Sequence, residues 1–357
     1  MAATDPRASD LLRYNQLHMH LAATHGPGTV SKSQVREEFD ALLSGCGTYP
    51  LGSALVSVAG RDRVRWLNGM ISNNIRDLAP GHGVYGFVLN PQGHIQADLY
   101  VFHDGEKLLI EIERSQRDTV LSLFRRYIIM DKVEVEDSSD KFRIFGVAGR
   151  KAEQVLSTLA WRKQLEPLEF GRWFLNGGEL TVVRKDNQAI PSYELWVPQE
   201  LADQTWRALE ASGAHTIHEE VLESWRVISG IPRFGQDIRN RDLPQETGQD
   251  RALNFNKGCY IGQEIVERVR SRGSVHRAFV GFEVEGAGPE PGSKIQSEGK
   301  DVGEITTSTW VPTAEGERAI AMGYLRKEFL EPGKELRVGA SRIQVRSFPF
   351  REFLVPG

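Results

Sequence analysis

One short segment in the last third of the chain brings together a thiol, an amine and several glycines. It reads Lys257-Gly258-Cys259-Tyr260-Ile261-Gly262-Gln263-Glu264. Glycines on both sides of Cys259 let the backbone come close to a ligand or another chain. A helix N-terminus after this segment, together with the Lys257 amine, would favour the thiolate form of Cys259. The segment predicts a reactive single-cysteine site; the alternative is a buried structural cysteine, because free cysteine is among the most buried residue types.

Cysteine usage limits the other chemistry that is available. The 357 residues include only Cys46 and Cys259. A disulfide framework is thereby excluded, and the usage is typical of a reducing cytoplasm. Two thiols also cannot supply the usual four ligands of an iron–sulfur cluster. Neither CxxC nor HExxH occurs, so the sequence predicts no metal site within this chain. From the cysteine usage we expect a cytoplasmic protein.

The composition describes an ordinary globular protein. Hydrophobic residues make up 40% and charged residues 26%, and the formal net charge is -4. The negative charge argues against nucleic acid as a partner. No apolar run approaches the roughly 20 residues that span a bilayer, so we expect no membrane partner. Residues 1–30 are interpreted as an N-terminal extension with a short helix near residues 11–21, and they lack the order of a secretory signal.

Apolar spacing and turn residues predict an α+β body over residues 31–274, because helices are set among hairpins rather than alternating regularly with strands. Capping boxes are expected at Ser31/Gln34 and Thr216/Glu219, and Gly230 suits a helix C-cap. Helices are expected at 31–43, 61–70, 115–127, 152–159, 200–212 and 216–229. Strands are expected at 54–58, 84–89, 94–102, 107–112, 133–135 and 143–147, with a hairpin over 179–197.

The last part of the chain changes character. Residues 231–258 are rich in Gly, Pro, Asp and Arg and have little periodicity, which is typical of a functional or mobile segment. A domain boundary is expected near Ser274. Residues 275–357 are predicted to form a small β-barrel from short strands between Gly/Pro turns. These strands are expected at 275–284, 294–297, 302–310, 317–324 and 335–347.

Four blocks together resemble the aminomethyltransferase-like YgfZ family, which includes mitochondrial iron–sulfur assembly relatives. They are the K-G-C-Y-I-G-Q-E segment, G-I-P-R-F-G at 230–235, L-P-Q-E at 243–246, and the D-R-V-x-x-L-x-G-like block at 62–75. The resemblance implies a fold similar to the glycine-cleavage T-protein, a three-domain ring around a central folate cavity with a C-terminal barrel. It implies tetrahydrofolate or a derivative as cofactor, and iron–sulfur client or assembly proteins as partners.

The resemblance also implies particular folate contacts. Glu194, in Tyr-Glu-Leu-Trp, matches the T-protein glutamate that contacts the pterin; the alternative is an outward-facing strand glutamate. Arg226 matches an arginine at the folate site; the alternative is a salt bridge on the helix surface. A carboxylate for the pterin edge and a cation for the glutamate tail are what a folate site needs.

Asp98 aligns with the acidic pair of the T-protein hairpin, one member of which is catalytic there. Here Gln96 and Ala97 occupy the neighbouring positions. The resemblance therefore implies either a polar residue near the folate or a catalytic acid at Asp98. Tyr85 and Asn73 are further candidates for the same cavity.

These features leave several classes of function open. The first is a folate-binding factor that assists assembly or repair of iron–sulfur proteins, with Cys259 as the functional thiol. The second is an aminomethyltransferase, but T-proteins resemble K-x-D-F-I-G where this chain has Cys259 in place of the acid. T-proteins also begin with a G-W-x-x-P-x-x-Y block, which is missing here. The third, a sarcosine-type demethylase, usually comes with a flavin domain, and no GxGxxG opens a βαβ unit.

A basic strip follows the thiol segment. It comprises Arg268, Arg270, Arg272, His276 and Arg277, with Glu267 as the only acid near them. Charge runs of this kind are most often solvated faces. The alternative is a local anion site for a polyglutamate tail or an acidic partner.

Overall fold

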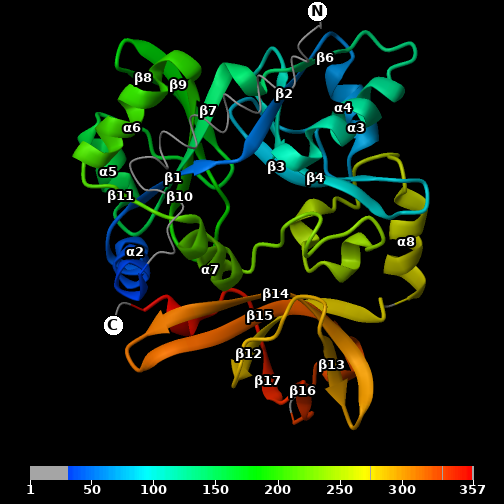
Figure 1. Cartoon of the computed structure of the whole chain (residues 1–357). Coiled ribbons are helices and arrows are strands. Elements are labelled where there is room, and N and C mark those ends of the chain that lie inside the picture. The colour runs from blue at the N-terminus through cyan, green and yellow to red at the C-terminus, as the bar shows by residue number, and fades with distance from the viewer. Residues whose placement is uncertain (1–30, 274, 332, 356–357) are drawn as a thin grey trace, which may run out of the picture.

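The computed structural model describes residues 31–273, 275–331 and 333–355. The expected helix at residues 11–21 lies outside this range. Two lobes built on β-sheets lie side by side, and a β-barrel forms the third lobe beneath them (Figure 1). Figure 1 also shows the irregular segment after α7 running between the barrel and the sheet lobes.

The first lobe is an antiparallel sheet of five strands covered on one face by two helices. Its helices, α3 (Arg63–Met70) and α4 (Arg117–Arg126), present Leu67 and Phe124 to the sheet, and both side chains are fully buried. Apolar residues three or four apart place these side chains on the sheet-facing side of each helix. In spatial order the strands are β3 (Gly83–Leu89), β4 (Ile95–His103), β5 (Leu108–Glu113), β2 (Ser53–Ala59) and β6 (Glu134–Asp137).

The second lobe is a sheet of six strands, covered by α5 (Ala152–Thr158) and α6 (Ala202–Ala211). Aromatic side chains join it to the first lobe: the ring of Phe102 lies 5.2 Å from that of Trp196. In spatial order its strands are β11 (His215–Thr216), β1 (Gly47–Leu51), β7 (Phe142–Ala148), β10 (Ser192–Pro198), β9 (Gly178–Arg184) and β8 (Phe170–Leu175).

The third lobe is a closed six-stranded barrel, which confirms the predicted architecture of the C-terminal part. Alternate residues such as Phe282 and Ile305 fill its interior. The strands, in order around the barrel, are β12 (Arg277–Glu285), β15 (Gly316–Arg326), β14 (Lys300–Thr313), β13 (Lys294–Ser297), β16 (Leu336–Val338) and β17 (Ser341–Arg346). We propose that a domain boundary near Ser274 separates this barrel from the body at residues 31–274.

Two helices connect the barrel to the second lobe. Ser31 caps helix α2 (Lys32–Ser44), since its hydroxyl accepts a hydrogen bond from the Gln34 backbone N–H. This is one half of the expected capping box; the Gln34 side-chain amide donates to Glu38 at 3.2 Å. Helix α7 (Glu219–Ser229) packs beside it and ends at Gly230 in a left-handed conformation (φ 70°). A side chain at Gly230 would collide with the ring of Phe348, so the C-cap requires glycine there.

The predicted α+β class is confirmed, but one helix boundary was wrong and some strands were missed. Helix α7 begins at Glu219 with His218 as its N-cap, and no capping box forms with Thr216. Thr216 instead pairs with Thr48 in the short parallel ladder between β1 and β11. Strand pairing across the sheet therefore overrides the local capping signal. Strands β1 and β8 were not predicted from the sequence.

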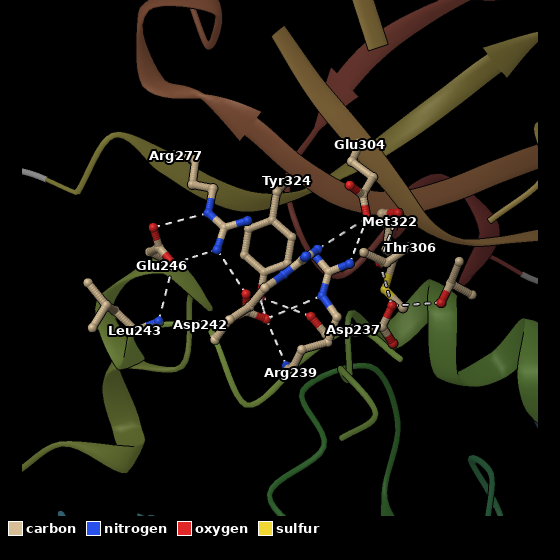
Figure 2. A network of polar contacts seen from close by, with 12 residues as sticks. Asp237, Arg239, Asp242, Leu243, Glu246, Arg277, Glu304, Thr306, Met322 and Tyr324 are labelled. Carbon is tan, nitrogen blue, oxygen red and sulfur yellow. Dashed lines mark hydrogen bonds and ion pairs between the residues drawn. The ribbon is translucent and has the colours of Figure 1, made fainter. Parts of the chain in front are cut away.

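The segment between α7 and α8 (Gln263–Arg272) fastens the barrel to the body through buried charges (Figure 2). It contains two short 3-10 helices, η4 (Pro244–Glu246) and η5 (Asp250–Ala252). Asp242 is fully buried and pairs with Arg277 at 2.8 Å; the Arg277 guanidinium also lies over the ring of Tyr324. These contacts give an irregular segment a fixed position between the lobes.

Candidate functional site

An aromatic pair beside a cation forms the centre of the candidate site. Tyr85 on β3 lies directly opposite Tyr100 on β4, with ring centroids 4.9 Å apart. The guanidinium of Arg251, from η5, lies 4.5 Å from the Tyr85 centroid and is paired with Asp186. We call Tyr85, Tyr100, Asp186 and Arg251 the tyrosine–arginine cluster. Flat rings beside a cation suit a flat ligand that carries negative charge.

Asp98 faces this cluster, as its position on the hairpin requires. Its carboxylate accepts hydrogen bonds from the Tyr85 hydroxyl (2.7 Å) and the Gln116 side-chain amide (2.8 Å). Its neighbour Ala97 points to the opposite face and is fully buried in the core of the first lobe. Burial raises the pKa of Asp98, although both hydrogen bonds oppose the shift. Asp98 therefore faces polar neighbours, and its carboxyl holds a proton more readily than an aspartate in water does.

Glu194 lies at the edge of the same region, but it already has partners. Its carboxylate pairs with Lys185 at 3.0 Å and accepts a hydrogen bond from the Trp196 indole at 3.3 Å. Lys185 also pairs with Glu111 and lies 3.6 Å from the centroid of Tyr100. Burial, and then the charge of Glu111, raise the pKa of Glu194 to about 8. The outward-facing alternative is wrong, because Glu194 is only 5% exposed.

This raised pKa predicts a pH effect on stability. A carboxyl whose pKa is higher in the folded than in the unfolded state loses stabilisation as pH rises from about its ordinary value of 4.5 toward 8. The free energy of unfolding of the natural protein, relative to that of Glu194→Gln, should therefore fall between pH 5 and pH 8. Urea denaturation of both proteins across this range measures the difference. A difference that stays constant with pH would contradict the expectation.

Arg226 does not fit the expected role of a direct folate contact. Its guanidinium donates to both carboxylate oxygens of Glu223, to Asp237, to the Ile231 carbonyl and to the Thr307 hydroxyl, at 2.6–3.3 Å. A guanidinium has five N–H donors, and all five are used. Arg226 instead joins α7 to the following segment and to the barrel. The salt-bridge alternative is correct in kind, but the pair is buried rather than on the surface.

Glu113, the last residue of β5, has a carboxyl with a shifted pKa and was not predicted from the sequence as a site residue. Desolvation raises the pKa of its carboxyl, and a hydrogen bond from Ser115 opposes this. The positive charges of Arg233 and Arg226 also lower the pKa of Glu113, and the negative charge of Asp98 raises it. Among these groups, Arg233 is half-buried and pairs with Glu223 through a single guanidinium nitrogen, which leaves it donors for an anion.

Cys259 and its neighbour Tyr260 in the thiol segment (residues 257–264) have opposite surroundings. Cys259 is exposed and free, whereas Tyr260 is buried in the core shared with Ile238 and Val266. The buried alternative for Cys259 is therefore wrong. The other cysteine, Cys46, is buried, and burial raises the pKa of its thiol to about 12 and so keeps it protonated.

The expected activation of the thiol by Lys257 is not what the structure shows. The Lys257 amine is buried and donates to the backbone carbonyls of Asn68 and Ile71, both at 2.6 Å, and to that of Asn73. Burial, and then the positive charge of Arg76, lower the pKa of Lys257 to about 7. Helix α8 begins only at Gln263, four residues after Cys259. Lys257 therefore anchors the segment to the end of α3.

The glycines of the segment shape this anchored turn. Gly258 and Gly262 both have left-handed backbone angles (φ 49° and 83°). A side chain at Gly262 would approach the Asn90 carbonyl to 2.6 Å, so only glycine lets the segment pack against the β3–β4 turn. Gln263 and Glu264 then open α8, with Glu264 exposed in its first turn.

The basic strip does not form one continuous cationic surface. Arg277 is neutralised by Asp242 and Glu246, and the Arg270 guanidinium lies 4.5 Å from the centroid of the Phe255 ring. Arg268 is exposed on α8. The alternative interpretation of the strip as a local anion site therefore lacks Arg277, whose charge serves the interface with the barrel.

Several cluster residues were missed although the sequence contains a signal for one of them. Tyr100 follows Asp98 by two positions on one strand, and this period places both on the same face. Arg251, Asp186 and Lys185 reach the cluster from segments distant in sequence, so local spacing could not indicate them.

Two absences concern only the parts of the chain that the structure describes. Within residues 31–273, 275–331 and 333–355, no group of three His, Cys, Asp or Glu side chains is arranged to hold a metal ion. Over the same ranges, none of the helices has the length and apolar character needed to cross a membrane.

Comparison with known proteins assigns the family. Residues 14–257 match the model of the GCVT N-terminal domain, and residues 277–349 match that of the glycine cleavage T-protein C-terminal barrel domain. The chain therefore belongs to the glycine cleavage T-protein family, which confirms the expected T-protein-like superfamily and its barrel.

Individual relatives agree with this assignment. An aminomethyltransferase from Rubrobacter xylanophilus is 25% identical, over 90% of this chain and 86% of its own length. A protein named a putative chloroplastic transferase from Arabidopsis thaliana is 25% identical, over 87% and 74%. The crystal structure of the glycine cleavage aminomethyltransferase T from Bartonella henselae superposes with a TM-score of 0.79 at 18% identity, covering 90% of each chain. The likeness to that structure shows a shared fold.

Proposed function

We propose that this chain binds tetrahydrofolate or a derivative at the tyrosine–arginine cluster. The residues present fit such a ligand: Tyr85 and Tyr100 offer aromatic walls beside Arg251, and Asp98 and Glu194 offer carboxyl groups for the pterin edge. Arg233, rather than Arg226, is suited to the anionic tail, because among the described residues its guanidinium pairs with Glu223 through one nitrogen only. A reduced folate, when bound, would supply ring nitrogens that carry a one-carbon unit.

Calorimetry with 5-formyl-tetrahydrofolate tests this proposal. We expect saturable binding to the natural protein and at least tenfold weaker binding to Arg251→Ala, because the loss of one charge-assisted contact costs about 1.5–3 kcal/mol. Arg268→Ala is the matched control, since Arg268 is an exposed arginine on α8 and is not a member of the cluster. Equal weakening by both variants, or no heat at high ligand concentration, would contradict the proposed site.

We further propose a YgfZ-type role in the cytoplasm, in which the folate-bound protein assists the assembly or repair of iron–sulfur proteins. The observation that carries this reading is the exposed Cys259 on a segment whose other contacts are buried. A thiol presented in this way can act on a partner or contribute one ligand to a shared cluster. It cannot hold a cluster alone, because four protein ligands are normally required.

Replacement of the thiol tests the proposed role. Cys259→Ala should lose at least 90% of the rescue of iron–sulfur enzyme activity in a deletion strain, while its stability and folate affinity stay unchanged. Ser271→Ala, which removes an exposed hydroxyl from α8, is the control. Full rescue by Cys259→Ala would rule out a functional thiol.

The second candidate function is a folate-dependent aminomethyltransferase. Two observations favour it: curated relatives carry that name, and Asp98 is a carboxyl with a raised pKa held by Tyr85 and Gln116. In this reading Asp98 would hold a proton near the ligand. A glycine-synthesis assay with lipoylated H-protein distinguishes the candidates. Turnover that is lost in Asp98→Asn but kept in Cys259→Ala would support the transferase and overturn the accessory role.

A further inference from the structure

A continuous set of direct contacts joins the thiol segment to the tyrosine–arginine cluster. At one end, the buried Lys257 amine binds the Asn73 carbonyl, and the Ile261 backbone N–H donates to the Gly69 carbonyl at 3.2 Å. Residues 256–263, which we call the thiol loop, are thus fastened to the end of α3 and to the residues that follow it.

The same residues after α3 also hold the cluster. The Asn73 side-chain amide donates to the backbone carbonyls of Tyr85 (2.7 Å) and Arg251 (2.9 Å). Ser72 donates to the Ala252 carbonyl at 2.6 Å and accepts from the Phe87 backbone N–H. Asn73 therefore lies between the two groups, with one contact to Lys257 through its carbonyl and two contacts to the cluster, to Tyr85 and Arg251, through its side-chain amide.

We infer that Lys257 is a positioning residue that couples the cluster to the thiol loop, so that a ligand bound at the cluster orders the segment that presents Cys259. The inference rests on the proposed folate site. A ligand that fixes Tyr85 and Arg251 also fixes Asn73, whose carbonyl is an acceptor for Lys257. Local opening of the thiol loop breaks the Lys257 contacts, so it becomes less favourable when that acceptor is held in place.

Coupling between two sites acts equally in both directions. If the ligand protects the thiol loop from opening by a given factor, loss of the Lys257 contacts must weaken ligand binding by a similar factor. Typical coupling is fivefold or more. Lys257→Met should therefore bind 5-formyl-tetrahydrofolate about fivefold more weakly than the natural protein, although Lys257 belongs to the thiol loop rather than to the cluster.

Hydrogen exchange of the full chain tests this inference, with 5-formyl-tetrahydrofolate as the probe. In the natural protein, saturating ligand should slow exchange in residues 256–263 about fivefold or more. In Lys257→Met at saturation the ligand should leave this exchange unchanged. Residues 336–346, in β16 and β17 of the barrel, serve as the internal control and should not respond to ligand.

The possible results separate the two proposals. If calorimetry shows binding but the thiol loop gains no protection, the coupling is overturned and the folate site stands. Protection that persists in Lys257→Met would also overturn the coupling through Lys257. Absence of binding overturns both. If Lys257→Met does not fold, Lys257→Arg is the second variant, because a planar guanidinium cannot replace an ammonium between three converging carbonyls; full ligand protection in this variant would again reject the inference.

Discussion

Replacing Asp237 with alanine is expected to lower the free energy of unfolding by about 3 kcal/mol, because it removes one of the two carboxylates that pair with the buried Arg226 and leaves Glu223 as the remaining counter-charge. Asp237 is fully buried and pairs with Arg226 at 2.6 Å. Its other carboxylate oxygen accepts hydrogen bonds from the hydroxyls of Thr306 and Thr307 on β14 (Figure 2 shows the contact with Thr306). One side chain thus joins α7, the irregular segment and the barrel.

Urea denaturation of Asp237→Ala measures this effect, with Asp40→Ala as the control. Asp40 is exposed on α2, and surface substitutions of this kind usually change stability by no more than about 0.5 kcal/mol. Asp237→Asn should fall between the two, since it keeps the shape and loses the charge. If Asp237→Ala were as stable as Asp40→Ala, the network between the body and the barrel would not be the stabilising contact that its burial indicates.

The elements that the sequence predicts best are those with strong local periodicity. Alternating apolar residues and Gly/Pro turns were sufficient for the barrel, and the spacing of Leu67 and Met70 was sufficient for α3. The predicted cap at Thr216 failed because Thr216 has a second use as a strand residue paired with β1. A capping box is a local signal, and a sheet partner distant in sequence can outweigh it.

In the site, too, contacts between residues close in the sequence could be predicted, and contacts between distant segments could not. Asp98 and Tyr85 could be placed together from the sequence because they belong to one hairpin, and the Tyr85 hydroxyl does donate to Asp98. The partners of Arg226 and Lys257 could not be predicted from the sequence. Their partners, Asp237 for one and the carbonyls after α3 for the other, depend on how distant segments meet. For a long cationic side chain, residue type and motif indicate importance but not the direction in which the charge points.

The exposed thiol bears on the proposed difference between this chain and transferases of the same fold. The resemblance places a thiol where T-proteins have an acid. In the structure that thiol is exposed, while Asp98 of the hairpin accepts hydrogen bonds from Tyr85 and Gln116. One-carbon chemistry and thiol chemistry would then occur on different segments of the protein, and Lys257 and Asn73 connect those segments.

Lys257→Met is expected to cost about 3 kcal/mol of unfolding free energy at pH 6, where the Lys257 amine is protonated. The substitution keeps most of the apolar stem but removes the donors to two buried carbonyls and one half-buried carbonyl. A buried acceptor left without a partner costs about 1–3 kcal/mol, and relief from burying a charge offsets part of the sum. Lys107→Met, at an exposed lysine, is the control for urea denaturation. Stability equal to the control would mean that water replaces the amine at all three carbonyls, and the thiol loop would then need another anchor.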